Sequence, residues 1–287
     1  MYRAFLLFAA ALLASASFTA NAAEEKDVLQ TPFGSRFFLS AGAYFPRLDT
    51  TVRVGDAAGN IGTQINFESN FGMNDNETLP LLSASWQIAR KHRLELRSFE
   101  LRREGAQTSD VTIFFNGKEF TSENVPIQAF FDTEVYALNY SYALVADPVK
   151  EFSLNFGLSI QDISTGLRGT LADGDNNVVD EKVGVTAPLP SLGIGGSWAF
   201  TDSRKWILNY RVGVFAIGLD LDAEANEEIE GRLIDGGVRV FHKTFKYVGF
   251  GAGLDYFRVK VDYKKRDLDS NFDYSYFGPS IFIASYF

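Results

Sequence analysis

The chain has 287 residues and no cysteine, so neither a disulfide framework nor a cysteine-ligated metal site is available to it. Beyond its N-terminal region it also lacks any apolar run of the roughly 20 residues that a membrane-spanning helix needs. Basic residues are in the minority, with 27 Lys and Arg against 36 Asp and Glu, and this balance argues against nucleic acid as a partner. Stability must therefore come from packing and backbone hydrogen bonds.

The N-terminus has the pattern of a secretory signal peptide. Arg3 precedes an apolar run from Ala4 to Ala16, and mostly small residues follow up to Ala22. The apolar run is too short to cross a bilayer as a helix. We expect residues 1–22 to be cleaved during secretion, and residues 23–35 to form a short periplasmic segment ahead of the first strand.

Aromatic residues make up 15% of the chain, and many lie in segments where apolar and polar residues alternate. Every second residue from Phe152 to Ile160 is apolar, for example, and Ser, Asn and Gly lie between them. This period predicts β-strands with two different faces. Ten strands are predicted, at residues 36–45, 79–88, 93–103, 132–144, 151–165, 189–200, 205–220, 231–241, 247–262 and 273–287.

The connections between these segments alternate in length. Short turns are predicted at 89–92, 145–150, 201–204 and 242–246, and long polar loops at 46–78, 104–131, 166–188, 221–230 and 263–272. An even number of strands with short turns on one side and long loops on the other is typical of a barrel that spans an outer membrane. The predicted fold is an all-β, antiparallel up-and-down transmembrane barrel over residues 36–287, with five surface loops. Ten strands fit best, and eight or twelve stay open.

In two predicted strands the alternation of apolar and polar residues changes phase partway, at Ser98 and near Tyr256. Such a change indicates either a β-bulge or the point where the strand leaves the membrane. Within the second long loop, Thr108–Phe115 and Lys118–Val125 flank the pair Asn116-Gly117. That pair is a strong signal for a tight hairpin turn, so we expect a hairpin there.

Alternation does not say which face points inward, so a soluble periplasmic sandwich or a lipid-carrying barrel stays open. Aromatic residues at the strand ends favour the membrane barrel, because such residues form girdles at the two membrane interfaces. The predicted girdle residues are Trp86, Tyr136, Tyr142, Trp198, Trp206, Tyr210, Phe245 and Tyr247.

The last stretch, Tyr274 to Phe287, resembles the final strand of Gram-negative outer-membrane β-barrel proteins, which typically ends in Phe preceded by alternating apolar residues. Ile281, Ile283 and Phe287 share this phase, whereas Ser285 departs from the usual apolar choice. The resemblance implies that these three residues are read by the barrel-assembly machinery during insertion. It also implies contact with outer-membrane lipid and lipopolysaccharide, and it indicates no particular family.

The sequence gives little support to catalysis. Outer-membrane barrel enzymes such as omptin proteases and lipid A deacylases rely on His with other polar groups, and a general base must reach its substrate. The only two histidines, His92 and His242, fall at the short periplasmic turns. An enzyme acting on lipid or peptide is therefore the least favoured function, and neither catalytic residues nor a cofactor are predicted.

An acidic loop at residues 173–181 begins like a calcium-binding loop, with oxygen ligands at alternate positions. Val178 stands where such a loop has Gly, and Gly184 stands where it has a bidentate Glu. A solvated acidic loop is the favoured interpretation. A weak site for a divalent cation stays open, and no metal ligand is assigned.

Charged side chains of both signs fall on the predicted inner face of the barrel. Because unpaired buried charge is costly, we expect them to pair and to plug the lumen. A ten-stranded barrel is only slightly wider than the eight-stranded kind that side chains fill. The candidate network comprises Glu95, Arg97, Arg211, Asp235 and Arg239, and the other predicted polar lumen residues are Asn139, Asn155, Gln161, Asn209 and Asp255.

The width of the lumen decides between two functions. Gly249, Gly251 and Gly253 either leave space inside the barrel or mark close packing against a large neighbour, such as Arg211 or Tyr286. A plugged lumen favours a structural or surface-interaction protein that acts through its extracellular loops on a surface ligand still to be identified. An open lumen favours a small channel for hydrophobic or small polar solutes.

Overall fold

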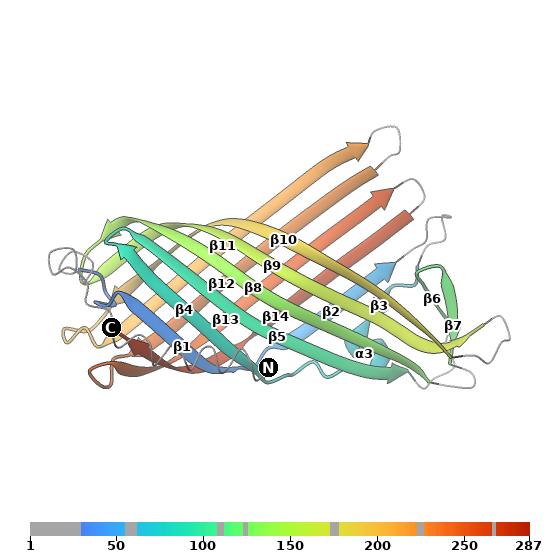
Figure 1. The fold of residues 1–287 in the computed structure, drawn as a ribbon, viewed down its shortest axis with the longest axis horizontal. Coiled ribbons are helices and arrows are strands. Elements are labelled where there is room, and N and C mark those ends of the chain that lie inside the picture. The colour runs from blue at the N-terminus through green and yellow to red at the C-terminus, as the bar shows by residue number, and fades with distance from the viewer. Residues whose placement is uncertain are drawn as a thin grey trace.

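The computed structural model describes residues 30–54, 62–107, 112–122, 126–172, 178–222, 227–265 and 268–287. The expected signal peptide and residues 23–29 lie outside the described residues. Ten wall strands form one closed antiparallel β-barrel (Figure 1), in which each strand pairs with the next along the chain and β14 pairs with β1.

The wall strands coincide with the ten predicted segments, and most of them are longer than predicted. They are β1 (Phe37–Tyr44), β4 (Leu79–Ala89), β5 (His92–Gln107), β8 (Ile127–Ala146), β9 (Lys150–Leu171), β10 (Val178–Ala199), β11 (Trp206–Asp222), β12 (Glu227–His242), β13 (Val248–Lys265) and β14 (Leu268–Tyr286). The predicted long loops are correspondingly too long, because the strands continue into them.

The first wall strand continues past a break. After Phe45 and Pro46 the chain resumes as β2 (Arg47–Val54), which pairs with the other half of β14. Pro46 lacks the backbone N–H that a β-ladder needs. The break therefore falls where regular pairing with β14 could not continue. Gly278 of β14 faces the break, and a Cβ there would lie 2.2 Å from the carbonyl oxygen of Phe45.

Four short elements lie outside the ten-stranded ring: β3 (Ile65–Asn66), α3 (Phe67–Phe71), β6 (Thr112–Phe115) and β7 (Lys118–Thr121). The hairpin of β6 and β7 is confirmed, and its turn residues Asn116 and Gly117 have φ of 47° and 77°, as a type I′ turn requires. Within the described part of the chain, no helix is long and apolar enough to cross a membrane.

The apolar face of the wall points outward, which rejects the soluble alternatives with apolar lumens. Exposed aromatic side chains form a girdle near each end of this apolar band. At the short-turn end they are Trp86, Trp198, Trp206, Phe245 and Tyr247, and at the other end they are Phe45, Tyr136, Tyr256 and Phe277. Six of the eight predicted residues belong to these girdles, whereas Tyr142 and Tyr210 are only partly exposed.

The phase changes at Ser98 and Tyr256 are not bulges. The β5–β8 ladder keeps one register from His92 to Gln107, and the β12–β13 and β13–β14 ladders also run through Tyr256 without a shift. Instead, the polarity of both faces reverses. In β5 the outer face changes from Leu96, which is 56% exposed, to charged residues, while the inner face becomes apolar and contains buried Leu101. Each strand leaves the membrane there.

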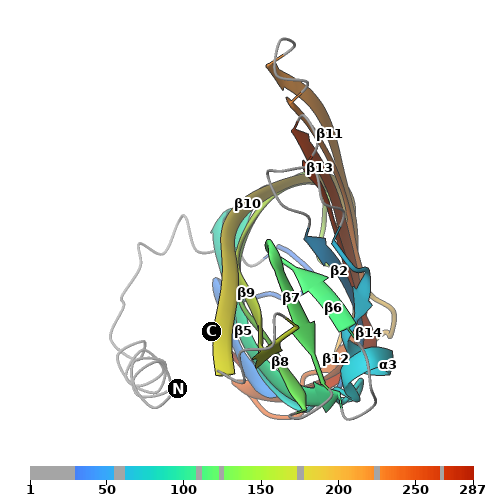
Figure 2. The same ribbon diagram turned by 90° about the vertical axis from the view of Figure 1, so that its right-hand side faces the viewer.

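Beyond this boundary the strands enclose an apolar core, which we call the extracellular core. Its buried residues come from β5, β8 and β9 on one side and from β12, β13, β14 and β2 on the other, with additions from α3 and the β6–β7 hairpin. Figure 2 shows these two sides of the wall facing each other. Phe131 of β8 and Tyr274 of β14, both fully buried, contact each other with ring centroids 5.4 Å apart. Arg103 of β5 pairs with Glu68 of α3 and donates to Thr50 of β2, so it joins three elements.

The three lumen-facing glycines of β13 pack against large side chains. A Cβ at Gly251 would lie 2.2 Å from the ring of Phe282, and the corresponding neighbours are Phe241 at Gly249 and Arg239 at Gly253. Close packing was therefore the correct alternative, but the predicted neighbours, Arg211 and Tyr286, were wrong.

We predict that charge on the outer face is costly only within the apolar band. Ile194→Arg in β10 should lower the free energy of unfolding by about 2–4 kcal/mol, the cost of Arg near the bilayer midplane. Thr186→Arg, on the same face of the same strand but beyond the band, should change it by less than about 1 kcal/mol. Urea unfolding in lipid vesicles followed by tryptophan fluorescence measures both, and equal losses would contradict the assigned membrane boundary.

Candidate lumen site

The structure places all five residues of the candidate network in the lumen. Arg97 Nε lies 3.0 Å from Glu95 Oε1, and Arg211 pairs with Asp235. These residues come from β5 and from the paired strands β11 and β12, which lie across the barrel from β5. Together with Asp255 of β13 they form a layer across the lumen, which we call the ionic layer.

Asp255 is the centre of the ionic layer, although the sequence indicated only that it faces the lumen. Its carboxylate lies 3.0 Å from Arg239 Nη2, 3.4 Å from Arg211 Nη2 and 3.6 Å from Arg97 Nη1. The layer thus contains three guanidinium groups and three carboxylates, so its formal charge is balanced. Asp255 precedes Tyr256, where the phase reverses, and sequence periodicity could not show which partners the barrel brings to it.

A second ion pair lies nearer the short turns. Arg93 Nη2 bonds Glu151 Oε2 at 2.7 Å, and Arg93 Nε donates to Gln87 Oε1, also at 2.7 Å. All three side chains are buried. This pair was not in the predicted network, because Arg93 and Glu151 stand at the first residues of their predicted strands.

The chain segment that precedes β1 packs into the lumen at its short-turn end. Thr31 and Ser35 are 2% and 6% exposed, and the ring of Phe33 lies between Phe38, with centroids 5.2 Å apart, and the Arg93 guanidinium, at 5.2 Å. We call residues 30–35 the N-terminal stopper. Its interior position was not predicted, because nothing in its composition distinguishes a stopper from a linker.

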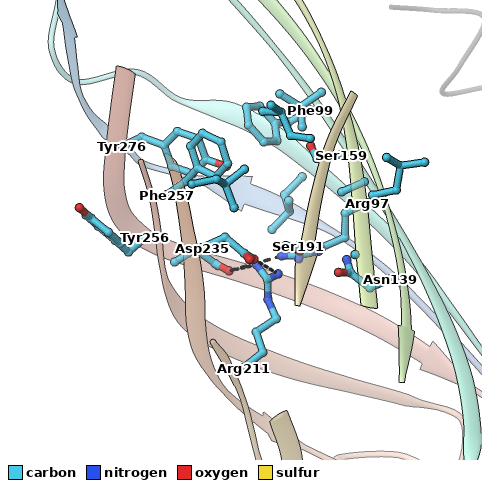
Figure 3. A pocket seen from close by; sticks show the side chains of 18 of the residues that line it. Arg97, Phe99, Asn139, Ser159, Ser191, Arg211, Asp235, Tyr256, Phe257 and Tyr276 are labelled. Atoms are coloured by element: carbon cyan, nitrogen blue, oxygen red, sulfur yellow. Dashed lines mark hydrogen bonds and ion pairs between the residues drawn. The ribbon is translucent and has the colours of Figure 1, made fainter. Parts of the chain in front are cut away.

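A cavity lies between the ionic layer and the extracellular core (Figure 3). Residues of the ionic layer, among them Arg97, Arg211 and Asp235, form its charged side. Asn139, Ser159 and Ser191 add uncharged polar groups, and aromatic and aliphatic side chains form most of the remaining wall. The apolar lining residues include Phe99, Leu189, Leu233, Phe257 and Tyr276.

The histidines lie near the short turns, as predicted, and away from this cavity. His92 Nδ1 lies 2.6 Å from Tyr140 Oη, and His242 Nδ1 lies 3.0 Å from Thr244 Oγ1. In the acidic loop, residues 173–177 lie outside the described residues, and Glu181 bonds Asn116 and Lys118 of the β6–β7 hairpin. Among the residues that the structure describes, no cluster of His, Asp and Glu could hold a metal ion.

The candidate assembly residues lie along the outer face of β14 and at its end. Ile281 and Ile283 are 56% and 47% exposed within the apolar band. The carbonyl oxygen of Phe287 accepts from the backbone N–H groups of Arg36 and Phe37, both at 2.8 Å. Their role as an insertion signal stays a prediction.

No protein-family model and no curated protein sequence matches the chain. Its structure is similar to that of the outer-membrane protease OmpT from Escherichia coli, with a TM-score of 0.53 and 11% identity over 88% of this chain and 97% of that chain. The outer-membrane protein OprG from Pseudomonas aeruginosa is also matched, with a TM-score of 0.37 and 9% identity over 88% of this chain and 96% of that one. The fold is that of Gram-negative outer-membrane β-barrels.

We predict that Asp255 stabilises the barrel far more than an outer-face carboxylate does. Asp255→Asn leaves three guanidinium groups without their shared anion and should lower the free energy of unfolding by about 3–5 kcal/mol. Asp273→Asn is the matched control, because Asp273 pairs with the half-exposed Arg258 and should contribute less than about 1 kcal/mol. Guanidinium unfolding measures both, and a small loss for Asp255→Asn would rule out a structural ionic layer.

We also predict that folding stability depends on pH through Lys243, which contacts the stopper. Burial, with a smaller effect of Arg204, lowers the pKa of Lys243 to about 8, and its Nζ donates to the Pro32 carbonyl at 3.1 Å. Because the folded-state pKa lies below the unfolded value, the unfolded chain binds more protons between about pH 8 and 10.5, and folding stability contributed by this group rises over that window. The free energy of unfolding, measured from pH 7.5 to 10, should rise more steeply in the native chain than in Lys243→Met. Parallel curves would contradict the prediction.

Proposed function

We propose that this protein is a non-enzymatic outer-membrane barrel, closed to ions and small polar solutes, that carries a rigid platform for contacts at the cell surface. The observation that carries the proposal is the extracellular core. A membrane strand needs about 9–11 residues, whereas β8, β9 and β10 contain 20, 22 and 22. About half of each strand is therefore available to build a body outside the membrane.

The packing of this body supports a platform rather than a set of loose loops. Phe67, Phe115, Phe120 and Phe131 are all 0% exposed, although three of them belong to α3 and the β6–β7 hairpin. Burying a Phe side chain contributes about 1.5–3 kcal/mol. Such a core holds the described strand ends in place, and a rigid scaffold is where binding loops are usually carried.

The closed lumen supports the same proposal. A solute moving along the barrel axis would have to pass the N-terminal stopper, the Arg93–Glu151 pair, the ionic layer and the extracellular core. In the ionic layer it would have to separate charges whose exchange for water is unfavourable unless every group finds a new partner. The proposed surroundings are outer-membrane lipid and lipopolysaccharide, with the surface partner contacting the extracellular end.

Conductance and solute uptake test the proposed closure. The mature protein, refolded and inserted into a planar bilayer, should show no steady single-channel current, and vesicles that contain it should not swell in solutions of small neutral sugars. A 16-stranded porin in the same bilayers is the positive control, since barrels of that size leave an aqueous channel. Protection of the wall strands from protease verifies that the silent protein has inserted.

A steady current or vesicle swelling would contradict the proposal and favour the small-channel alternative. In that event, a variant with the ionic layer removed in a charge-balanced way, Arg211→Ala with Asp235→Ala, should increase the current. The matched control is Arg258→Ala with Asp273→Ala, which removes an ion pair from the outer face and should leave the current unchanged.

A further inference from the structure

We propose that the short-turn end of the barrel selects anionic phospholipids of the periplasmic leaflet through a rim of cations that have no carboxylate partners in the described chain. This rim lies at the end opposite the extracellular core, so the proposal does not depend on the proposed surface function. Three separate observations support it: the charge of the two ends, the position of the cations at the membrane interface and the packing of two neighbouring turns.

Every short turn contains or adjoins a basic residue, and these turns lie together at one end of the barrel (Figure 1). The described turns contain only two acidic side chains, Asp147 and Asp202. Because the whole chain has a net charge of −9, the sign of this end is opposite to that of the chain. Eight basic residues, all at least partly exposed, form what we call the basic rim: Arg36, Arg90, Lys91, Lys150, Arg204, Lys205, Lys243 and Lys246.

The basic rim differs from the extracellular end in how its charges are balanced. Beyond the extracellular boundary, the cations that form ion pairs with carboxylates are Arg47, Arg102, Arg103, Lys118, Arg168, Arg232, Arg258 and Lys260. Among the described residues, no carboxylate lies within 4 Å of a cation of the basic rim. Arg90 Nη2 donates instead to the carbonyl of Ala146 at 2.7 Å, and Lys243 Nζ donates to that of Pro32. These bonds leave the positive charges without a counter-charge.

Two cations of the basic rim lie on aromatic rings near the membrane surface. Lys246 Nζ lies 4.9 Å from the ring centroid of Tyr247, and Lys91 Nζ lies 6.0 Å from that of Tyr142. Tyr247 is 52% exposed and belongs to the short-turn girdle, and such girdle rings sit at the level of the lipid head groups. Long cationic side chains near the ends of membrane segments hold their charge at this level. The nearest anions outside the chain are therefore lipid phosphates.

The cations are densest where two turns lie side by side. The backbone N–H of Lys243, in the β12–β13 turn, donates to the carbonyl of Lys205, in the β10–β11 turn, at 2.8 Å. Arg204 and Lys246 belong to the same two turns, which together contain four cations and one acidic side chain, Asp202. Arg204 has φ of 52°, in the left-handed region that favours Gly, so the chain carries a cation where the backbone alone would favour another residue.

The chemistry of the basic rim identifies the class of lipid. Guanidinium and ammonium groups form charge-assisted hydrogen bonds with phosphate oxygens. In a zwitterionic phospholipid, the amine of the head group offsets its own phosphate, whereas an anionic head group leaves the phosphate charge to the protein. Basic residues near the surface of an anionic leaflet each add to the attraction. The short turns of such barrels face the periplasm, so the lipid is one of the periplasmic leaflet.

Lipid selectivity in a symmetric bilayer tests the proposal. The refolded mature barrel is placed in phosphatidylcholine bilayers that contain traces of spin-labelled phosphatidylglycerol or spin-labelled phosphatidylcholine. The motionally restricted fraction of each label gives the association constant of the anionic lipid relative to the zwitterionic one. At low salt the native barrel should favour phosphatidylglycerol by about threefold or more. In 1 M NaCl the preference should fall toward one, because the Debye length is then only about 3 Å.

A matched pair of triple variants locates the selective end. The rim variant Lys91→Gln, Lys205→Gln, Lys246→Gln removes three exposed cations and should lower the preference by about twofold or more. The control variant Arg232→Gln, Arg258→Gln, Lys260→Gln also removes three exposed cations, but from the extracellular boundary, where each has a carboxylate partner. It should keep the native preference. Both leaflets contain the labelled lipid, so both ends of the barrel are sampled.

Protection of the wall strands from protease verifies that each variant is folded, and the single change Lys246→Gln replaces the rim variant if that one does not fold. A native barrel without a preference, or equal losses in the rim and control variants, would overturn the proposal. So would a preference that survives 1 M NaCl. Rim-dependent co-sedimentation with purified peptidoglycan, in place of lipid selectivity, would also overturn it and assign the basic rim to the cell wall.

Discussion

One constraint shapes the whole molecule: every backbone N–H and C=O group inside the hydrocarbon layer needs a hydrogen-bond partner. An unpaired group there costs several kcal/mol. A ring of antiparallel ladders satisfies this constraint only if the last strand returns to the first, which β14 does by pairing with β1 from Phe38 to Tyr44. The same constraint explains where the ring is incomplete. The β10–β11 ladder ends at Leu192 and Val214, where the outer face of the neighbouring strand turns polar and water can replace the missing partners.

Crossing the membrane boundary reverses the roles of the two faces of the wall. Inside the membrane, lipid requires an apolar outer face, so charged groups such as Arg97 and Asp255 occupy the interior and neutralise each other. Outside the membrane, water surrounds the wall, so apolar groups such as Phe131 and Tyr274 occupy the interior. One strand therefore contributes to an ionic layer with its first half and to a hydrophobic core with its second, without a change in register.

This reversal also explains which predictions succeeded. All ten wall strands could be predicted, and so could the two faces of the segment from Phe152 to Ile160, because alternation is regular within the membrane. The extensions of β8, β9 and β10 lie in segments that the sequence predicts as loops, because alternation weakens where the two faces exchange polarity. Individual ladders and turns leave local sequence signals, as Asn116-Gly117 did. The central place of Asp255, the neighbours of the β13 glycines and the stopper at Phe33 depend on side chains brought together from opposite walls, and no periodicity in a single sequence encodes those contacts.

The proposed closure along the axis depends on charge balance as well as on packing. An ion that reached the middle of the lumen would meet a charge-balanced layer in which Arg211 and Arg239 already pair with Asp235 and Asp255. It would gain no partner there to replace its water, and separating the existing pairs is unfavourable unless each group finds a new partner. Phe33 of the stopper at one end and the extracellular core at the other add packed side chains to the path. The barrier to an ion is therefore electrostatic as well as steric, whereas the barrier to a neutral polar solute is mainly steric.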